Sequence, residues 1–185
     1  MGSFCPSNGE KSKVVAEDKK KRNPFEKPKF VEALQHVYKH ETGQLVDYPK
    51  KYGGETKFGI SKNTFPDVDI KNLSQEDATK IYEREYWNKI QGEKLPRSIG
   101  KTVLDSAVLS GQSTAVKSLQ KILGNKQDGN VGDKTIQSVL DYTAEHGEGS
   151  LAKRYNANRE ARVKRIRGAV RFGRGWTARI KALEE

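Results

Sequence analysis

The chain has 185 residues and a formal net charge of +11 at pH 7, from 35 lysine and arginine against 24 aspartate and glutamate side chains. This length can bury one sizeable core, whereas two separate domains would both be small. The single cysteine, Cys5, excludes an internal disulfide bond and most cysteine-based zinc sites.

Residues 1–29 are predicted to form a disordered basic tail, because they are almost wholly polar and carry the run Lys19-Lys20-Lys21-Arg22. The segment lacks the roughly 7–15 apolar residues of a signal-peptide core, and no part of the chain approaches the roughly 18 apolar residues of a membrane span. The tail could equally be a solvating segment or an arm that binds anionic envelope polymers.

A helix is predicted from Phe30, because apolar residues recur there at helical spacing. They are Phe30, Ala33, Leu34, Val37 and Tyr38. Continued to Glu41, the same spacing places this carboxyl on the core-facing stripe. An acid held against apolar side chains keeps its proton near neutrality, since its charged form is desolvated, and a proton donor for breaking a glycosidic bond needs that property. The alternative is an ordinary surface acid at a helix end.

His36 and His40 lie one helical turn apart beside this acid. The two-histidine zinc helix has a similar spacing, but its glutamate follows the first histidine, so the order here is wrong for that site. We therefore predict no metal and no organic cofactor.

The segment after this helix is predicted to turn at Gly53-Gly54, where glycine lets the backbone approach a ligand closely. A short β-hairpin is expected around residues 54–60. Downstream, Ser74 is a predicted N-cap, followed by acidic residues in the first turn of a helix. Further helices are expected at 99–109, 114–123, 133–144 and 151–170. The predicted fold class is α+β and mostly α-helical.

Several segments resemble, in order, glycoside hydrolase family 108, the N-acetylmuramidases of bacteriophages and of bacteria with related genes. The similarity covers about residues 30 to 180. Its elements are Glu41-Thr42-Gly43, Pro49, Gly53-Gly54-Glu55-Thr56-Lys57-Phe58-Gly59-Ile60-Ser61, Tyr86-Trp87, the run Val103-Leu104-Asp105-Ser106-Ala107, Asp128-Gly129-Asn130-Val131-Gly132-Asp133, Arg159, and Gly175-Trp176-Thr177-Ala178-Arg179.

The resemblance implies a lysozyme-like, single compact domain with a small β-hairpin near the active site. Residues 30–92 would be the catalytic segment, and residues 93–185 a helical peptidoglycan-binding segment packed on it. The implied reaction is hydrolysis of the β-1,4 bond between N-acetylmuramic acid and N-acetylglucosamine, with Glu41 as the proton donor. A water molecule would be placed by Thr56 or by Asp47 acting as base. The predicted substrate-binding residues are Lys51, Tyr52, Gly53, Gly54, Ser61 and Trp87.

One departure from the family leaves alternatives open. The family usually has an aspartate between the loop proline and the glycine pair, where this chain has Lys50 and Lys51. The substitutes are Asp47, Glu55 or the Thr56 hydroxyl, so both inverting and retaining hydrolysis stay possible. A wall-binding protein without catalysis is the main alternative, and a basic nucleic-acid-binding protein is the weaker one, since no nucleic-acid fold pattern is present.

The predicted partner is bacterial peptidoglycan, with anionic envelope polymers binding through the basic tail and the cationic C-terminal helix. No nucleic acid is expected, and the protein is predicted to be a monomer. By analogy with phage endolysins, we expect it to stay in the host cytoplasm until it is released to the cell wall at lysis.

Overall fold

The computed structural model describes residues 27–41, 43–165, 175 and 177–183. The predicted basic tail up to residue 26, Thr42, Trp176 and the last five residues of the helix expected at 151–170 lie outside this part. Within it, the fold is α+β and mostly helical, with one small antiparallel sheet, which confirms the predicted class. No described helix is long and apolar enough to cross a membrane.

Helix α1, Pro28–His40, begins two residues before the expected start. Pro28 occupies its first turn, where the fixed φ angle of proline suits a helix and its missing N–H is not needed. The predicted apolar stripe is buried, with Phe30 and Val37 fully inaccessible. The helix therefore presents the expected face to the core.

The sheet has three strands rather than a single hairpin. It comprises β1 (Val46–Asp47), β2 (Glu55–Lys57) and β3 (Ile60–Ser61), in the order β1-β2-β3, with Thr56 opposite both Val46 and Ser61. A 3-10 turn, η2 (Lys50–Tyr52), connects β1 to β2. The additional strand β1 is only two residues long, too short for its pattern to have been recognised in the sequence.

The β2–β3 turn consists of Phe58 and Gly59, both at positive φ, 50° and 75°. Two positive φ angles are the requirement of a tight two-residue hairpin turn. Phenylalanine is an uncommon residue for this conformation. Its ring packs beside Gly43 and Tyr38, and these contacts hold the residue there.

Helix α2, Gln75–Tyr82, has the predicted cap, because the Ser74 side chain accepts a hydrogen bond from the Asp77 backbone N–H at 3.0 Å. A π-helical turn, η3 (Glu83–Trp87), extends it and is followed by the 3-10 turn η4 (Gly92–Lys94). The later helices are α3 (Arg97–Ser110), α4 (Gln112–Ile122), α5 (Asp133–His146) and α6 (Glu148–Arg165). Their order and approximate ranges agree with the sequence-based expectation.

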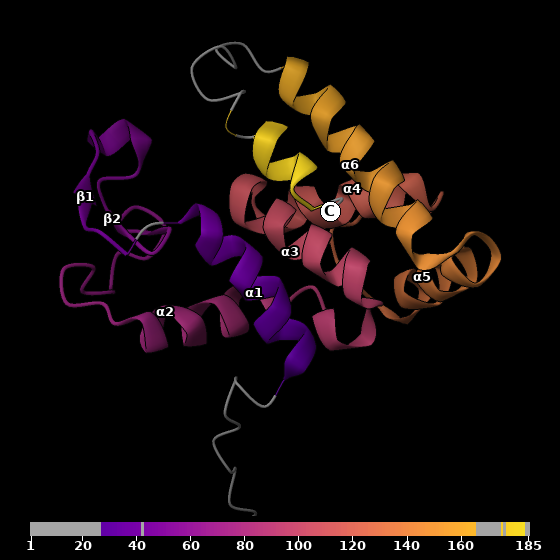
Figure 1. The fold of residues 1–185 in the computed structure, drawn as a ribbon, viewed down its shortest axis with the longest axis horizontal. Coiled ribbons are helices and arrows are strands. Elements are labelled where there is room, and N and C mark those ends of the chain that lie inside the picture. The colour runs from indigo at the N-terminus through magenta and orange to yellow at the C-terminus, as the bar shows by residue number, and fades with distance from the viewer. Residues whose placement is uncertain (1–26, 42, 166–174, 176, 184–185) are drawn as a thin grey trace, which may run out of the picture.

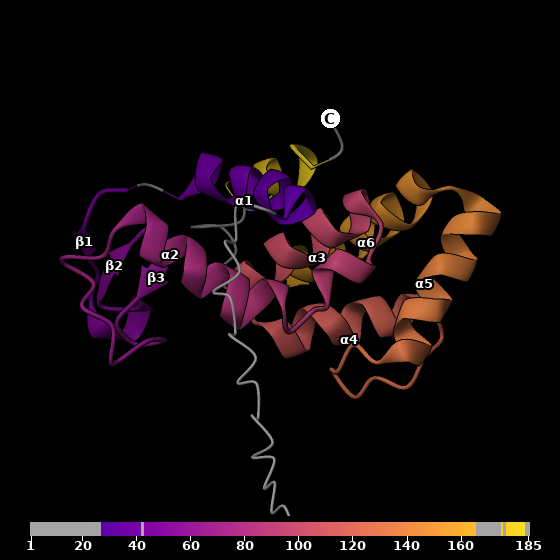
Figure 2. The same cartoon turned by 90° about the horizontal axis from the view of Figure 1, so that it is seen from below.

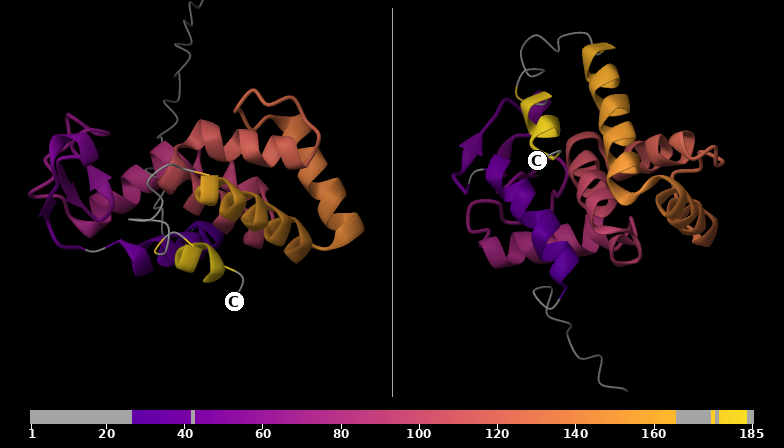
Figure 3. Two further views of the ribbon diagram at one scale, coloured as in Figure 1. Left: turned by 90° about the horizontal axis from the view of Figure 1, so that it is seen from above. Right: turned by 45° about the vertical axis from the view of Figure 1, so that its right-hand side comes forward.

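Helix α3 is the centre of the molecule and packs against α1, α4 and α6 (Figure 1). The sheet lies at one end of the molecule and α5 at the other (Figure 2). A final helical turn, residues 177–181, brings the end of the chain back between α1 and α6 (Figure 3). This return places a C-terminal side chain next to the end of α1.

Candidate active site

Glu41 lies at the junction of α1 and the loop that leads to the sheet. It is the C-cap residue of α1, with extended backbone angles of φ −113° and ψ 118°, and its N–H still bonds to the Val37 carbonyl at 3.1 Å. The predicted position on the apolar stripe is therefore wrong, because helical spacing no longer applies to a residue that has left the helix. The side chain is 22% exposed, so solvent and a ligand can reach it.

The nearest polar partner of Glu41 is Arg179, which is 138 residues away in the sequence. The Arg179 Nη1 donates to the Glu41 Oε1 at 2.6 Å, a short charge-assisted hydrogen bond. The prediction that apolar side chains alone surround this acid is therefore wrong. A guanidinium group, supplied by the C-terminal turn, takes the place of an apolar wall.

The β2–β3 turn presses against the other side of the Glu41 side chain. A Cβ atom added to Gly59 would lie 2.9 Å from the Glu41 Cδ and 2.5 Å from the Tyr82 Oη. The Tyr82 hydroxyl donates to the Phe58 carbonyl at 2.9 Å and so fastens this turn to α2. Only glycine leaves room for the acid at this point.

Two tyrosines add to the environment of Glu41. Burial, and then the Glu41 charge, raise the pKa of Tyr82 well above its ordinary value. The pKa of Tyr86 is raised by burial and by the charges of Glu85 and Glu41. Both phenols therefore stay neutral at physiological pH. Among the described residues, Glu41 is flanked by neutral phenols, a glycine turn and the Arg179 guanidinium.

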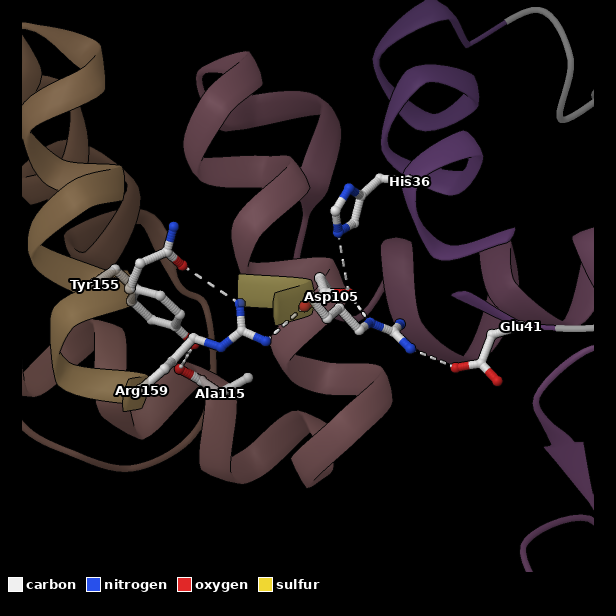
Figure 4. A network of polar contacts seen from close by, with 8 residues as sticks. His36, Glu41, Asp105, Ala115, Tyr155 and Arg159 are labelled. Atoms are coloured by element: carbon white, nitrogen blue, oxygen red, sulfur yellow. Dashed lines mark hydrogen bonds and ion pairs between the residues drawn. The ribbon is translucent and has the colours of Figure 1, made fainter. Parts of the chain in front are cut away.

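Behind Arg179 lies Asp105, a fully buried carboxylate from the middle of α3. Its Oδ1 accepts from the Arg179 Nε at 2.6 Å, and its Oδ2 accepts from the Nη2 of Arg159, on α6, at 2.5 Å. Burial alone would raise the pKa of Asp105, but the charges of Arg179 and Arg159 hold it below its ordinary value. Figure 4 shows Asp105 between Arg159 on one side and Glu41 on the other.

His36 faces the same aspartate from α1. Its Nε2 is 3.6 Å from the Asp105 Oδ1 and has no hydrogen-bond partner among the described residues. Burial lowers the pKa of His36 to about 4, against the opposing effect of Asp105, so the imidazole is neutral at physiological pH. Within the described part of the chain, no three histidine, cysteine or acidic side chains are grouped to bind a metal ion.

The two candidates for positioning water lie on opposite faces of the sheet. Thr56 pairs with Val46 and Asp47 pairs with Glu55, and successive residues of a strand point to opposite sides. The Thr56 hydroxyl donates to the Gly54 carbonyl at 3.1 Å, which is the turn-stabilising bond that threonine commonly makes. At most one of the two side chains can share a face with the substrate.

Some of the predicted substrate-binding residues lie at the surface, and others do not. Tyr52 is 51% exposed on the η2 turn, and Ser61 is half-buried and bonds to Thr64. Gly53 and Gly54 have positive φ angles of 125° and 68°, as the predicted turn requires. Trp87, in contrast, is fully buried and donates to Glu93, so it belongs to the core and not to a sugar-binding surface. The Lys51 side chain lies outside the described part.

A groove between α1 and α2 lies apart from Glu41. It has a volume of about 340 Å³ and a mainly apolar lining that includes Leu34 and Tyr38 but not Glu41. We place the candidate site at Glu41, because four separate segments meet at this partly exposed carboxyl: the end of α1, the β2–β3 turn, α2 with Tyr82, and the C-terminal turn with Arg179. This convergence is a more specific feature than an apolar groove.

Sequence reasoning missed the ion network of Asp105, Arg159 and Arg179 as a unit. One sign of it was available, since Asp105 interrupts the apolar run Val103-Leu104 and Ala107 in the most buried helix of the molecule. A buried carboxylate needs a cationic partner. The identity of that partner depends on how the chain returns at residue 179, which no local pattern indicates.

Comparison with known proteins gives a consistent result. The family described as Glycosyl hydrolase 108 matches residues 34–111, and the family described as Predicted Peptidoglycan domain matches residues 114–181. Among solved structures, SagA of Brucella abortus is similar, with 35% identity and a TM-score of 0.76, over 85% of this chain and 92% of that chain. No protein with curated annotation matches the chain.

Proposed function

The chain belongs to glycosyl hydrolase family 108, and we propose that it is a muramidase, which cleaves the β-1,4 bond between N-acetylmuramic acid and N-acetylglucosamine. The broader class is a glycoside hydrolase that acts on peptidoglycan, since a hydrolase segment is followed by a peptidoglycan-binding segment. The observation that carries the finer proposal is Glu41, a partly exposed acid held between the β2–β3 turn and Arg179.

In the proposed mechanism, Glu41 protonates the oxygen that leaves as the sugar–sugar bond breaks, while positive charge develops at the anomeric carbon. Because Arg179 engages Oε1, the proton would be carried on Oε2, the oxygen left for substrate. The fixed partner also orients the acid before substrate arrives, which is where much of the rate enhancement of a positioned proton donor originates.

Water then attacks the anomeric carbon, placed by Thr56 or by Asp47 acting as base. The opposite faces of these two side chains make the choice testable. If Thr56 positions the water, Thr56→Val loses activity while Asp47→Asn keeps it, and Asp47 as base gives the reverse. The stereochemistry of the first-formed product then tells inverting from retaining hydrolysis.

The decisive variant is Glu41→Gln, which keeps the shape of the side chain and removes its acidic proton. We expect it to abolish the clearing of permeabilised bacteria and the formation of new reducing ends on muramic acid, while binding to isolated walls is retained. The matched control is Glu32→Gln, because Glu32 is an exposed glutamate on the same helix, paired with Arg97 at 2.8 Å. Normal lysis by Glu41→Gln would reject the mechanism.

A second candidate function is a wall-binding protein without catalysis. It is favoured by Lys50 and Lys51, which stand where the family usually has an aspartate. A parent protein that is pulled down with walls but releases no reducing ends would establish it.

For the biological setting, we propose a phage lysin that acts from inside the host. The resemblance to phage muramidases supports this role. Expression in a bacterial cytoplasm should leave cells intact until a separate pore-forming protein is supplied, and lysis without any such protein would contradict it.

A further inference from the structure

We infer that Arg179, in the peptidoglycan-binding segment, is a positioning residue of the active site that holds the Glu41 carboxyl in the orientation needed for proton transfer. The inference rests on the proposed role of Glu41. It adds that residues 114–181 are not merely an anchor to the wall, because they contribute to the hydrolytic site itself.

The geometry of Arg179 supports this role. One guanidinium joins two carboxylates, with Nε on Asp105 and Nη1 on Glu41, both at 2.6 Å. The guanidinium is planar and its donors are fixed relative to one another, so a constraint on Nε is transmitted to Nη1. A lysine has a single nitrogen on a flexible stem and cannot reproduce both contacts in this arrangement.

Arg179 is itself firmly held. It is only 5% exposed, and its partner Asp105 is completely buried and tied by its second oxygen to Arg159. Burial alone would lower the pKa of Arg179, but the charges of Asp105 and Glu41 raise it. The guanidinium therefore stays charged at physiological pH, and it provides a permanent cation beside the acid.

The groups that face Glu41 come from several elements. Tyr82 on α2 and Tyr86 on η3 are neutral phenols, His40 precedes the acid on α1, and the Phe58–Gly59 turn has no titratable group. Among the described residues, Arg179 is the cationic side chain that pairs with Glu41. The Glu41 carboxyl is therefore directed by this charged donor, which fixes one of its two oxygens.

Three full-length variants separate the possible roles of Arg179. Arg179→Gln removes both the charge and the fork, whereas Arg179→Lys keeps the charge. Arg159→Gln is the comparison variant, because Arg159 is a buried arginine that is paired with the same aspartate and not with Glu41. The assay is hydrolysis of a short soluble peptidoglycan glycan, with kcat and KM measured separately, so that wall anchoring does not contribute. Thermal melting and circular dichroism report the folded state.

For Arg179→Gln we expect kcat to fall about 10- to 100-fold with little change in KM, as for a misplaced catalytic group. For Arg179→Lys we also expect a lower kcat, because a single nitrogen cannot make both contacts of the guanidinium fork. Arg159→Gln should melt earlier, and its kcat should fall less than that of Arg179→Gln, because Arg159 acts on Glu41 only through Asp105 and Arg179.

Two results would overturn the inference. One is a parental kcat in Arg179→Gln, and the other is an equal fall of kcat in Arg179→Gln and Arg159→Gln, which would mark a purely structural network. If Arg179→Gln does not fold, Arg179→Lys decides the matter, since a parental kcat in that variant also contradicts the inference. Glu41→Gln separates the two levels. An active Glu41→Gln would refute the proposed function, whereas an inactive Glu41→Gln beside a parental Arg179→Gln would refute the positioning role alone.

Discussion

Gly59→Ala is expected to damage the active site more than the fold. Gly59 has a φ angle of 75°, which an alanine adopts only at a cost of about 1 kcal/mol. The added Cβ would also lie 2.5 Å from the Tyr82 Oη and 2.9 Å from the Glu41 Cδ. The first distance is about 0.9 Å short of the 3.4 Å at which ordinary contacts begin, so Tyr82, Glu41 or the turn must move.

The structure gives the size of both effects. Overpacking of this kind costs about 1–3 kcal/mol, so with the backbone strain the variant should be about 2–4 kcal/mol less stable. For a chain of this size that lowers the melting temperature by roughly 10 °C. A displacement near 1 Å at a catalytic group can reduce the rate about 100-fold. Activity should therefore fall far more than the folded fraction at 25 °C.

Gly124→Ala is the matched control for this prediction. Gly124 has a similar φ angle of 70°, but no heavy atom of the described residues lies within 4 Å of an added Cβ. It should lose about 1 kcal/mol of stability and keep its hydrolytic rate. Melting curves and reducing-end assays on both variants make the comparison. Equal activity in the two alanine variants would refute the close approach of Gly59 to Glu41.

Two further predictions concern the ion network. Asp105→Asn leaves Arg159 and Arg179 without their shared buried partner charge. We expect it to lower the free energy of unfolding, measured in urea, by about 3–5 kcal/mol. A loss below about 1 kcal/mol would contradict the network. Burial lowers the pKa of His36 to about 4 in the folded protein, from an ordinary value of 6.5. Between these two values the unfolded chain binds more protons than the folded one. The free energy of unfolding should therefore fall as the pH drops from about 6.5 to about 4. The same titration with His36→Gln should show a smaller acid loss. Identical acid profiles would mean that folding does not lower the pKa of His36.

Much of the fold could be predicted from the sequence, because most of its elements carry a local pattern. The apolar repeat of α1, the Ser74 cap of α2 and the glycines after α4 and α5 each depend on nearby residues alone. Strand β1 has only two residues, and its existence depends on pairing with β2, so no pattern within it could indicate a strand. The prediction of the fold therefore failed at the shortest element, whose structure depends on a distant partner strand.

The candidate site divides in the same way. Glu41 and the glycine turn follow one another in the chain, and a motif can represent both. The surroundings of Glu41 were predicted wrongly because they come from residues 58–59, 82 and 179, which meet only after the chain has folded. Trp87 shows the opposite error, since an aromatic residue in a family motif suggested a sugar contact, although its ring fills the core beside Phe30.

The ion network is better explained by position than by stability. Buried ion pairs often contribute little to stability, because desolvation offsets their attraction, and apolar residues of similar volume frequently serve as well. Apolar packing alone, however, would not fix the direction of a guanidinium. Asp105 binds Arg159 and Arg179 through different oxygens, and this leaves the Nη1 of Arg179 directed at Glu41. An aspartate in the middle of α3 therefore makes sense as the support of a directed hydrogen bond, which explains why the most buried helix of the molecule contains a charge.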